Sequence, residues 1–179
     1  MTGEVLGIAL IRIAGALPVL RWPLAGGILA VLVDLSDLLL MDVLDMGGIP
    51  DYQRLDKALD LVYLGTFTAV ALRWRGPDRW VALALLGWRL VGFVAFELSG
   101  ERWLLLVFPN VFEVWFLLVA ALHHRWNPVP WTPRSLAGAL VGLLALKELQ
   151  EWAIHGARLF DNLYALDVIR DIWRSVSGG

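Results

Sequence analysis

The sequence contains no cysteine and little charge, and both shortages limit what the protein can be. Without cysteine it can form no disulfide, Cys-ligated zinc site, iron–sulfur cluster or thiolate nucleophile. Charged residues make up 18% of the 179 residues, and hydrophobic residues make up 59%. An ordinary soluble domain has about 25% charged and about 45–50% apolar residues. We therefore expect an integral membrane protein, located in a prokaryotic-type plasma membrane.

The charges that are present do not indicate a soluble partner. The net charge is −2, and no basic patch with interleaved aromatic residues is present, so we expect no nucleic acid partner. The first twenty residues include Glu4 and lack a basic start, which argues against a cleaved signal peptide. The expected partners are membrane lipids, with a homodimer or a larger membrane complex as further alternatives.

Six apolar stretches alternate with segments rich in proline and glycine. About 20 apolar residues suffice to span a bilayer as a helix, and proline and glycine mark the connections. We therefore predict an all-α, polytopic bundle of about six transmembrane helices in one domain, residues 1–155. The polar tail, residues 156–179, is predicted to form an amphipathic helix. The predicted transmembrane helices cover residues 4–20, 24–45, 55–74, 79–98, 103–124 and 134–155.

Six crossings would place the connections on two sides of the membrane. One side collects arginines and tryptophans, and tryptophan is typical of a membrane interface. The internal loops alone make this side cytoplasmic, but with the tail included the basic residues are equal on both sides, so orientation stays open. The tryptophans expected at this interface are Trp22, Trp74, Trp80, Trp126 and Trp131.

Four aspartates interrupt the apolar sequence of the second and third predicted helices. Asp34 and Asp37 are three residues apart, and Asp56 and Asp60 are four apart, so each pair shares a helix face. The short connection predicts antiparallel neighbours, which would bring the pairs together. Such a cluster needs a bound cation or retained protons, and oxygen ligands favour Mg²⁺ or Mn²⁺. We therefore predict a metal site at these four residues; the alternative is an acidic helix end among lipid headgroups.

The stretch from Asp34 to Asp60 resembles the CDP-alcohol phosphatidyltransferase signature, D-x2-D-G-x2-A-R-x8-G-x3-D-x3-D. The first pair matches Asp34-Leu-Ser-Asp37, and the second matches Asp56-Lys-Ala-Leu-Asp60. Six helices, with the signature between the second and third, are also the layout of that family. Arg12 resembles a basic residue that the family often has in its first helix. The resemblance implies a metal-dependent phosphotransferase acting on a CDP-linked or other phospholipid-type substrate, with Asp60 helping to deprotonate the acceptor alcohol.

The stretch departs from the family pattern at its glycines and at its Ala-Arg step. Leu38 replaces the first glycine, Met41 and Asp42 replace Ala-Arg, and the two aspartate pairs are one residue too far apart. Because glycine allows a ligand to approach the backbone closely, a catalytically degenerate relative is also consistent with these residues. A non-catalytic subunit or scaffold of a larger bioenergetic or pigment-binding complex is the alternative function, and a small ion transporter is a third.

Other polar residues lie inside or at the ends of the later apolar stretches. Arg89 and Glu113 are expected to form a buried ion pair, because charges in a bilayer pair or line a cavity. Pro109 should kink the fifth helix. Glu148, Glu151 and His155 share a helix face, as in a metal site, a proton relay or a helix end at the interface. The predicted secondary polar cluster comprises Arg12, Arg89, Glu97, Asn110, Glu113, Glu148, Glu151 and His155.

Overall fold

The computed structural model describes residues 3–43, 52–101 and 103–151, and every regular element in these ranges is a helix. The prediction of an all-α fold is therefore confirmed, whereas the predicted tail helix lies outside the described residues. The elements are α1 (Gly3–Ala16), the 3₁₀-helix η1 (Leu17–Leu20), α2 (Pro23–Val43), α3 (Tyr52–Ala71), α4 (Pro77–Ser99), α5 (Trp103–Val107), α6 (Val111–Leu122) and α7 (Pro133–Glu151).

Two of the six predicted helices are interrupted, and a proline stands at each interruption. Pro18 lies in η1, which continues α1 as a tighter helix. Pro109 separates α5 from α6, so the expected kink is a complete break of the helix. Proline has no N–H to donate and clashes with the preceding turn, which explains both positions. At Gly92 of α4 a Cβ atom would overlap the side chain of Phe108, so the close contact between α4 and the break requires glycine.

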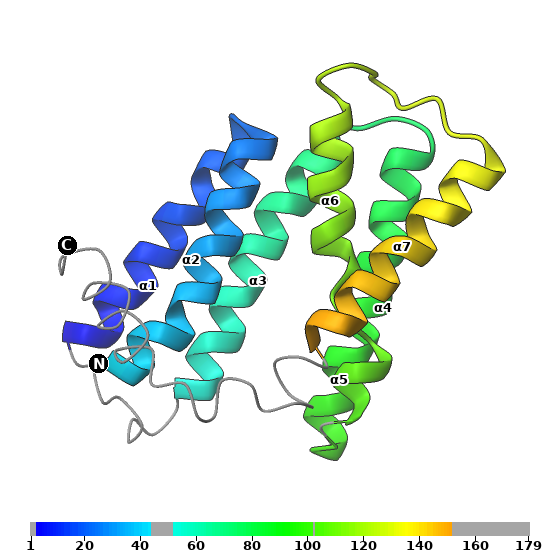
Figure 1. The fold of residues 1–179 in the computed structure, drawn as a ribbon. Helices are drawn as coiled ribbons and strands as arrows, with labels where there is room; N and C mark the ends of the chain where they lie inside the picture. Colours follow the sequence, from blue (N-terminus) through cyan, green and yellow to red (C-terminus); the bar gives the residue numbers. More distant parts are fainter. Residues whose placement is uncertain (1–2, 44–51, 102, 152–179) are drawn as a thin grey trace, which may run out of the picture.

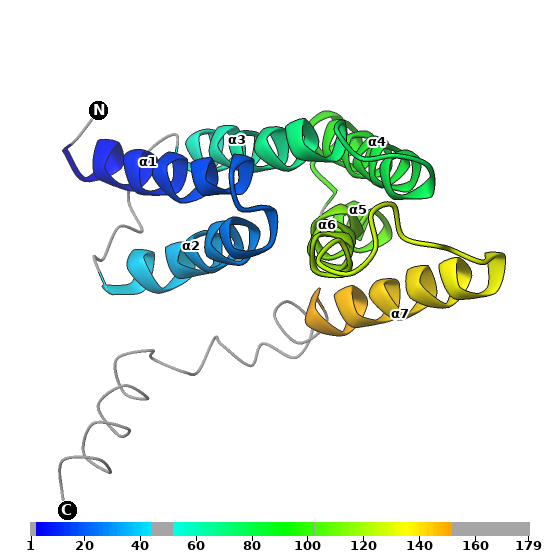
Figure 2. The ribbon, with the colours of Figure 1, turned by 90° about the horizontal axis from the view of Figure 1, so that it is seen from above.

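The helices form two layers, and successive long helices run in opposite directions. One layer contains α1, α3 and α4, and the other contains α2, α6 and α7 (Figure 2). The connections that follow η1, α3 and α6 all lie at one end of the bundle (Figure 1). We call it the arginine end, after Arg21, Arg73, Arg75 and Arg125. The structure thus places the arginine-bearing connections together, as the predicted alternation of helices requires.

Aromatic residues of α3 and α6 form the centre of the core. The rings of Phe67 and Phe116 stack with centroids 4.1 Å apart, and Trp74 stacks on Phe116 at 5.1 Å. Trp74 is buried, and Trp131 is half-buried and stacks on Trp115, so these two tryptophans of the arginine end are less exposed than the other three. Both instead fill the space between helices. The tryptophans of the arginine end that are exposed are Trp22, Trp80 and Trp126.

The outer surface of the bundle carries many apolar side chains. Among the described residues, α4 is the helix that is both long and apolar enough to cross a membrane, with a mean hydropathy of 1.8. Only 11% of the apolar 18-residue stretch of α4 to which this value applies is buried inside the protein, so most of its surface faces outward. The structure therefore offers one candidate span, and the six-span arrangement stays a prediction. The other apolar helical stretches are shorter and cover Ala9–Leu20, Pro23–Asp34, Leu59–Ala71 and Val111–Leu122.

Candidate functional site

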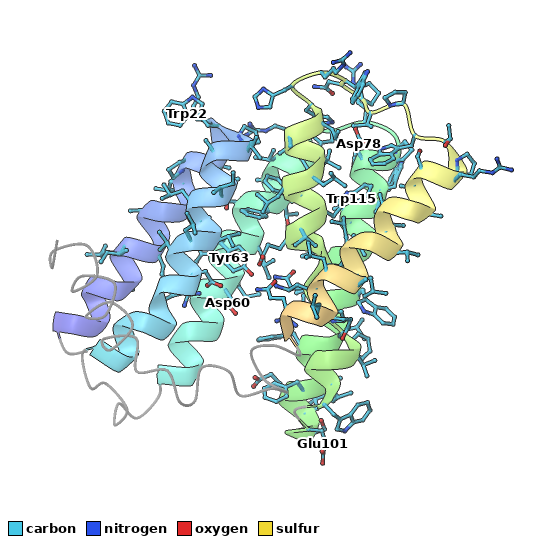
Figure 3. The ribbon with its side chains drawn as sticks, in the orientation of Figure 1. Trp22, Asp60, Tyr63, Asp78, Glu101 and Trp115 are labelled. Carbon is cyan, nitrogen blue, oxygen red and sulfur yellow. The ribbon has the colours of Figure 1, made fainter. Side chains whose placement is uncertain are left out.

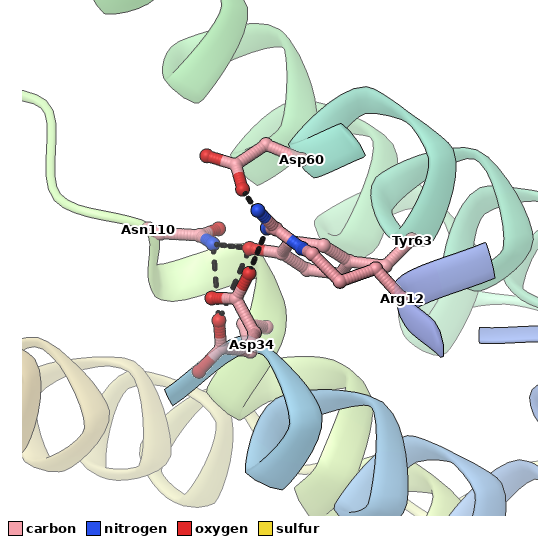
Figure 4. A network of polar contacts seen from close by, with 6 residues as sticks. Arg12, Asp34, Asp60, Tyr63 and Asn110 are labelled. Carbon is pink, nitrogen blue, oxygen red and sulfur yellow. Dashed lines mark hydrogen bonds and ion pairs between the residues drawn. The ribbon is translucent and has the colours of Figure 1, made fainter. Parts of the chain in front are cut away.

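A buried arginine joins the two helices that carry the aspartates. Arg12 of α1 has a side chain that is 5% exposed, and its Nη2 atom donates to Oδ1 of Asp34 on α2. The same nitrogen donates to Oδ1 of Asp60 on α3 at 2.6 Å. Figure 4 shows the guanidinium between the two carboxylates. One cation therefore ties α1, α2 and α3 together.

The structure brings together one member of each predicted aspartate pair. The side chains of Asp34 and Asp60 are 30% and 34% exposed, so both carboxylates reach the outside of the bundle although Arg12 does not. Asp37 lies in α2 and Asp56 in α3, but their side chains are outside the described part of the structure. Of the four aspartates, the structure therefore describes the side-chain contacts of Asp34 and Asp60.

A second polar network begins at Tyr63, one turn after Asp60 on α3. The amide nitrogen of Asn110 donates to the Tyr63 hydroxyl at 2.8 Å and to Oε2 of Glu113 at 3.2 Å. The Tyr63 hydroxyl donates to the same Glu113 oxygen at 3.3 Å, and the Lys147 ammonium of α7 lies 3.7 Å from Oε1 of Glu113. All four side chains are buried. Sequence reasoning missed Tyr63, although its spacing of three residues from Asp60 places both on one helix face.

The two networks lie side by side in the core, where Figure 4 shows Tyr63 and Asn110 next to Arg12 and its aspartates. The break at Pro109 explains part of this arrangement, because it places Asn110 at the start of α6 and Glu113 in its first turn. The positive end of a helix stabilises a carboxylate at that position. We call the combined set the polar centre; it comprises Arg12, Asp34, Asp60, Tyr63, Asn110, Glu113 and Lys147.

Arg89 and Glu113, which were expected to form an ion pair, each contact another group. Arg89 donates from Nη1 to the carbonyl oxygen of Phe108 at 3.1 Å, and Lys147 approaches Glu113 instead. The physical reason is the break after α5, which leaves carbonyl groups without partners within the helix and thus attracts a guanidinium. Sequence reasoning did not assign Lys147 to the site.

The remaining residues of the predicted secondary cluster lie elsewhere or outside the described residues. Glu97 is exposed near the end of α4, and Glu148 is half-buried on α7. Glu151 is the last residue of α7, and its side chain is outside the described part. His155 falls entirely outside it. The described residues therefore do not test a carboxylate–histidine site at the end of α7.

The metal site predicted at the four aspartates stays a prediction, because the side chains of Asp37 and Asp56 lie outside the described part, and the polar centre by itself does not fit a divalent cation. Within residues 3–43, 52–101 and 103–151, the described side chains include no group of three or more His, Asp or Glu residues that could hold a metal ion. Arg12 already contacts one oxygen of Asp34 and one of Asp60, which is where a bridging ion would bind. Arg12 and Lys147 also balance two of the three carboxylates of the polar centre, which leaves one negative charge, whereas a metal site for hard cations usually keeps a larger excess.

A small cavity beside the polar centre lies between α3 and α4. Asp60 and Tyr63 line it from α3, and Arg89 and Phe93 line it from α4. Its volume is about 10 Å³, close to the minimum that holds a single water molecule. A carboxylate and a guanidinium therefore face one narrow space at the edge of the polar centre.

A second buried polar cluster, at the arginine end, was not anticipated from the sequence. Asp78, in the first turn of α4, is fully buried and accepts hydrogen bonds from the Trp131 indole at 2.5 Å and the Val129 backbone N–H at 3.1 Å. Nε2 of His123 lies 2.8 Å from the same carboxylate, and the Trp115 indole donates to the Asp78 carbonyl at 3.2 Å. The cluster fastens the α6–α7 connection to α4. An acidic residue at a helix start was the available signal.

Comparison with known proteins does not assign the chain to a family. No protein-family model matches the chain, and no curated protein or solved structure shows a significant similarity to it. The resemblance to the phosphatidyltransferases therefore rests on residues 34–60 and on the placement of Arg12.

Proposed function

We propose that the protein is a polytopic membrane protein of a prokaryotic-type plasma membrane whose polar centre carries out a phosphotransferase-like reaction. The substrate would be a CDP-linked or other phospholipid-type molecule. One observation carries this proposal: Asp34 and Asp60, from the two halves of the signature-like stretch, meet at Arg12 inside an apolar bundle. Ionisable groups among membrane helices are costly and usually functional. The outward-facing apolar surface of α4 supports the membrane setting.

Asp60 is the carboxylate best placed to act as a general base. It lines the cavity between α3 and α4, where a substrate hydroxyl could enter and donate its proton. Arg12 holds the carboxylate in position. Arg89 lines the same cavity, and a guanidinium binds phosphate oxygens with two parallel hydrogen bonds; because the cavity holds only a water-sized group, the phosphate would lie outside it. The acceptor oxygen would then bond to phosphorus, and CMP would leave.

CMP release from CDP-diacylglycerol by the purified protein in lipid nanodiscs tests this proposal. The assay includes several acceptor alcohols and is run with Mg²⁺, with Mn²⁺ and with neither. Asp60→Asn should lower the rate by about 100-fold or more, because a positioned general base contributes about 10²–10⁴-fold. Glu101→Gln is the matched control, since it also converts an acid to an amide but lies exposed beyond the end of α4 (Figure 3). The proposed reaction would be refuted if the unaltered protein released CMP no faster than a protein-free control. It would also be refuted if Asp60→Asn released CMP as fast as the unaltered protein.

The ion pairs of Arg12 favour a second candidate, a non-catalytic membrane subunit. Arg12 pairs with both Asp34 and Asp60, and ion pairs of this kind can hold helices together without any catalytic role. Trp80 and Trp88 of α4 are exposed and offer apolar contact area to a partner. This candidate predicts that a stoichiometric partner or pigment copurifies in mild detergent. A colourless preparation of this chain alone would argue against it.

A further inference from the structure

A second and much larger cavity lies at the arginine end of the bundle. Its volume is about 480 Å³, and its walls come from the start of α2 and the end of α6. This size is within the range of about 300–1,000 Å³ that is typical of small-molecule sites. Trp22 lies at its edge and is far along the bundle from Asp60 (Figure 3). The cavity is therefore separate from the polar centre.

An arginine and a histidine from two different connections line this cavity. Arg21 precedes α2 and His124 follows α6, and both side chains are exposed. His123 also lines the cavity, but the buried carboxylate of Asp78 contacts its ring. None of the described residues that line the cavity is acidic. The rim formed by Arg21 and His124 therefore suits a negatively charged group.

The start of α2 adds a second positive element to the same wall. This helix has 21 residues and begins at Pro23, which lines the cavity together with Leu24 and Ala25. The first turn of a helix has N–H groups without partners inside the helix, and the helix dipole makes that end positive. Helix starts of this kind bind phosphate groups. The start of α2 therefore adds a positive electrostatic contribution to the wall that Arg21 also lines.

The remaining wall of the cavity is apolar. Leu24 and Ile28 of α2 face Ala120 of α6 across it, so a ligand that fills the cavity needs an apolar part as well as a charge. Trp22 is 62% exposed at the edge, as expected of a tryptophan at a membrane surface. A free phosphate ion would leave this apolar wall without contact, whereas a phospholipid would cover it.

We propose that this cavity binds one anionic phospholipid. Its phosphate and headgroup would contact Arg21, His124 and the start of α2, and the beginning of an acyl chain would lie against Ile28 and Ala120. This inference goes beyond the proposed reaction, because the lipid site is independent of the polar centre and requires no catalysis. It adds a site that holds the arginine end in the headgroup layer.

Native mass spectrometry of the delipidated full-length protein tests this site, with phosphatidylglycerol and phosphatidylcholine added in equal amounts. Phosphatidylglycerol should bind preferentially. Arg21→Gln should weaken its binding about fivefold, the effect typical of one basic residue at an anionic membrane surface. Arg75→Gln is the matched control, because this exposed arginine lies at the same end but does not line the cavity. Equal losses in the two variants would overturn the proposal, as would equal binding of the two lipids.

A cavity-filling variant tests the same site without changing its charge. Ala25→Phe should weaken phosphatidylglycerol binding about tenfold, because the phenyl ring would occupy space in the cavity that the lipid needs. Unchanged binding in this variant would place the lipid elsewhere. Displacement of the lipid by millimolar inorganic phosphate would identify the cavity as a site for free anions and refute the proposed phospholipid site. Asp60→Asn should keep full phosphatidylglycerol binding, so failure of the lipid site and failure of the proposed reaction are distinguishable.

Discussion

Replacing Arg12 with methionine should destabilise the protein strongly, because it leaves two carboxylates inside the bundle without their shared cation. Removing one partner of a buried ion pair costs about 3–5 kcal/mol. Asp34 and Asp60 are 30% and 34% exposed, so water compensates part of the loss. We therefore expect a loss near the lower limit, about 3 kcal/mol.

Thermal unfolding of the detergent-solubilised protein measures this effect. For a chain of this size about 1 kcal/mol corresponds to about 2–4 °C, so Arg12→Met should lower Tm by about 6–12 °C. Arg75→Met is the control; that arginine is exposed, and its loss should change stability by less than about 0.5 kcal/mol.

A triple variant separates lost charge pairing from lost packing. Arg12→Met combined with Asp34→Asn and Asp60→Asn removes the cation and both charges, so it should regain most of the stability. Equal melting temperatures of Arg12→Met and the control would refute the ion-pair argument. A triple variant that stays as unstable as Arg12→Met would show that the aliphatic stem of Arg12, rather than its charge, holds the helices together.

Three further predictions concern other contacts of the fold. Asp78→Asn should cost about 1–3 kcal/mol, because it leaves a buried donor of the cluster at the arginine end without an acceptor; thermal unfolding monitored by tryptophan fluorescence would show a lower Tm. Gly26→Ala should destabilise the protein, since a Cβ there would overlap the backbone of η1, whereas Gly87→Ala on α4 meets no atom within 4 Å and should stabilise it by about 0.5–1 kcal/mol; denaturation of the two variants in parallel compares them. A double-mutant cycle of Glu113→Gln and Lys147→Met should give a coupling energy of at least about 0.5 kcal/mol, and additive effects would show that the pair does not interact.

Much of the helical framework was predictable, because its signals are local in the chain. Apolar stretches broken by proline and glycine predicted six helices, and the structure has helices in all six places. The sequence also predicted a kink at Pro109, although it did not show that the helix would break completely. Whether five of these stretches cross a membrane is not decided by their helical structure, because several apolar portions are shorter than α4.

The candidate site was predictable only in part. Helical spacing and the expected antiparallel pairing indicated that Asp34 and Asp60 would approach each other. These patterns did not indicate that Arg12 would lie between the two carboxylates. A bound metal ion would also have relieved the repulsion between them. The choice of Lys147 over Arg89 as the cation near Glu113 depends on how α7 packs against α6, which no local pattern contains.

By itself, the sequence determined the composition of the bundle, the positions of its helices and the residues that had to find polar partners, because hydrophobic periodicity and proline act over a few neighbouring positions. Tertiary structure alone decided which partners those residues found. Hydrogen bonds and ion pairs act over about 3–4 Å. The side chains that meet at Arg12 are 22 and 48 residues away from it in the chain. Only the packing of α1, α2 and α3 could bring them within that range.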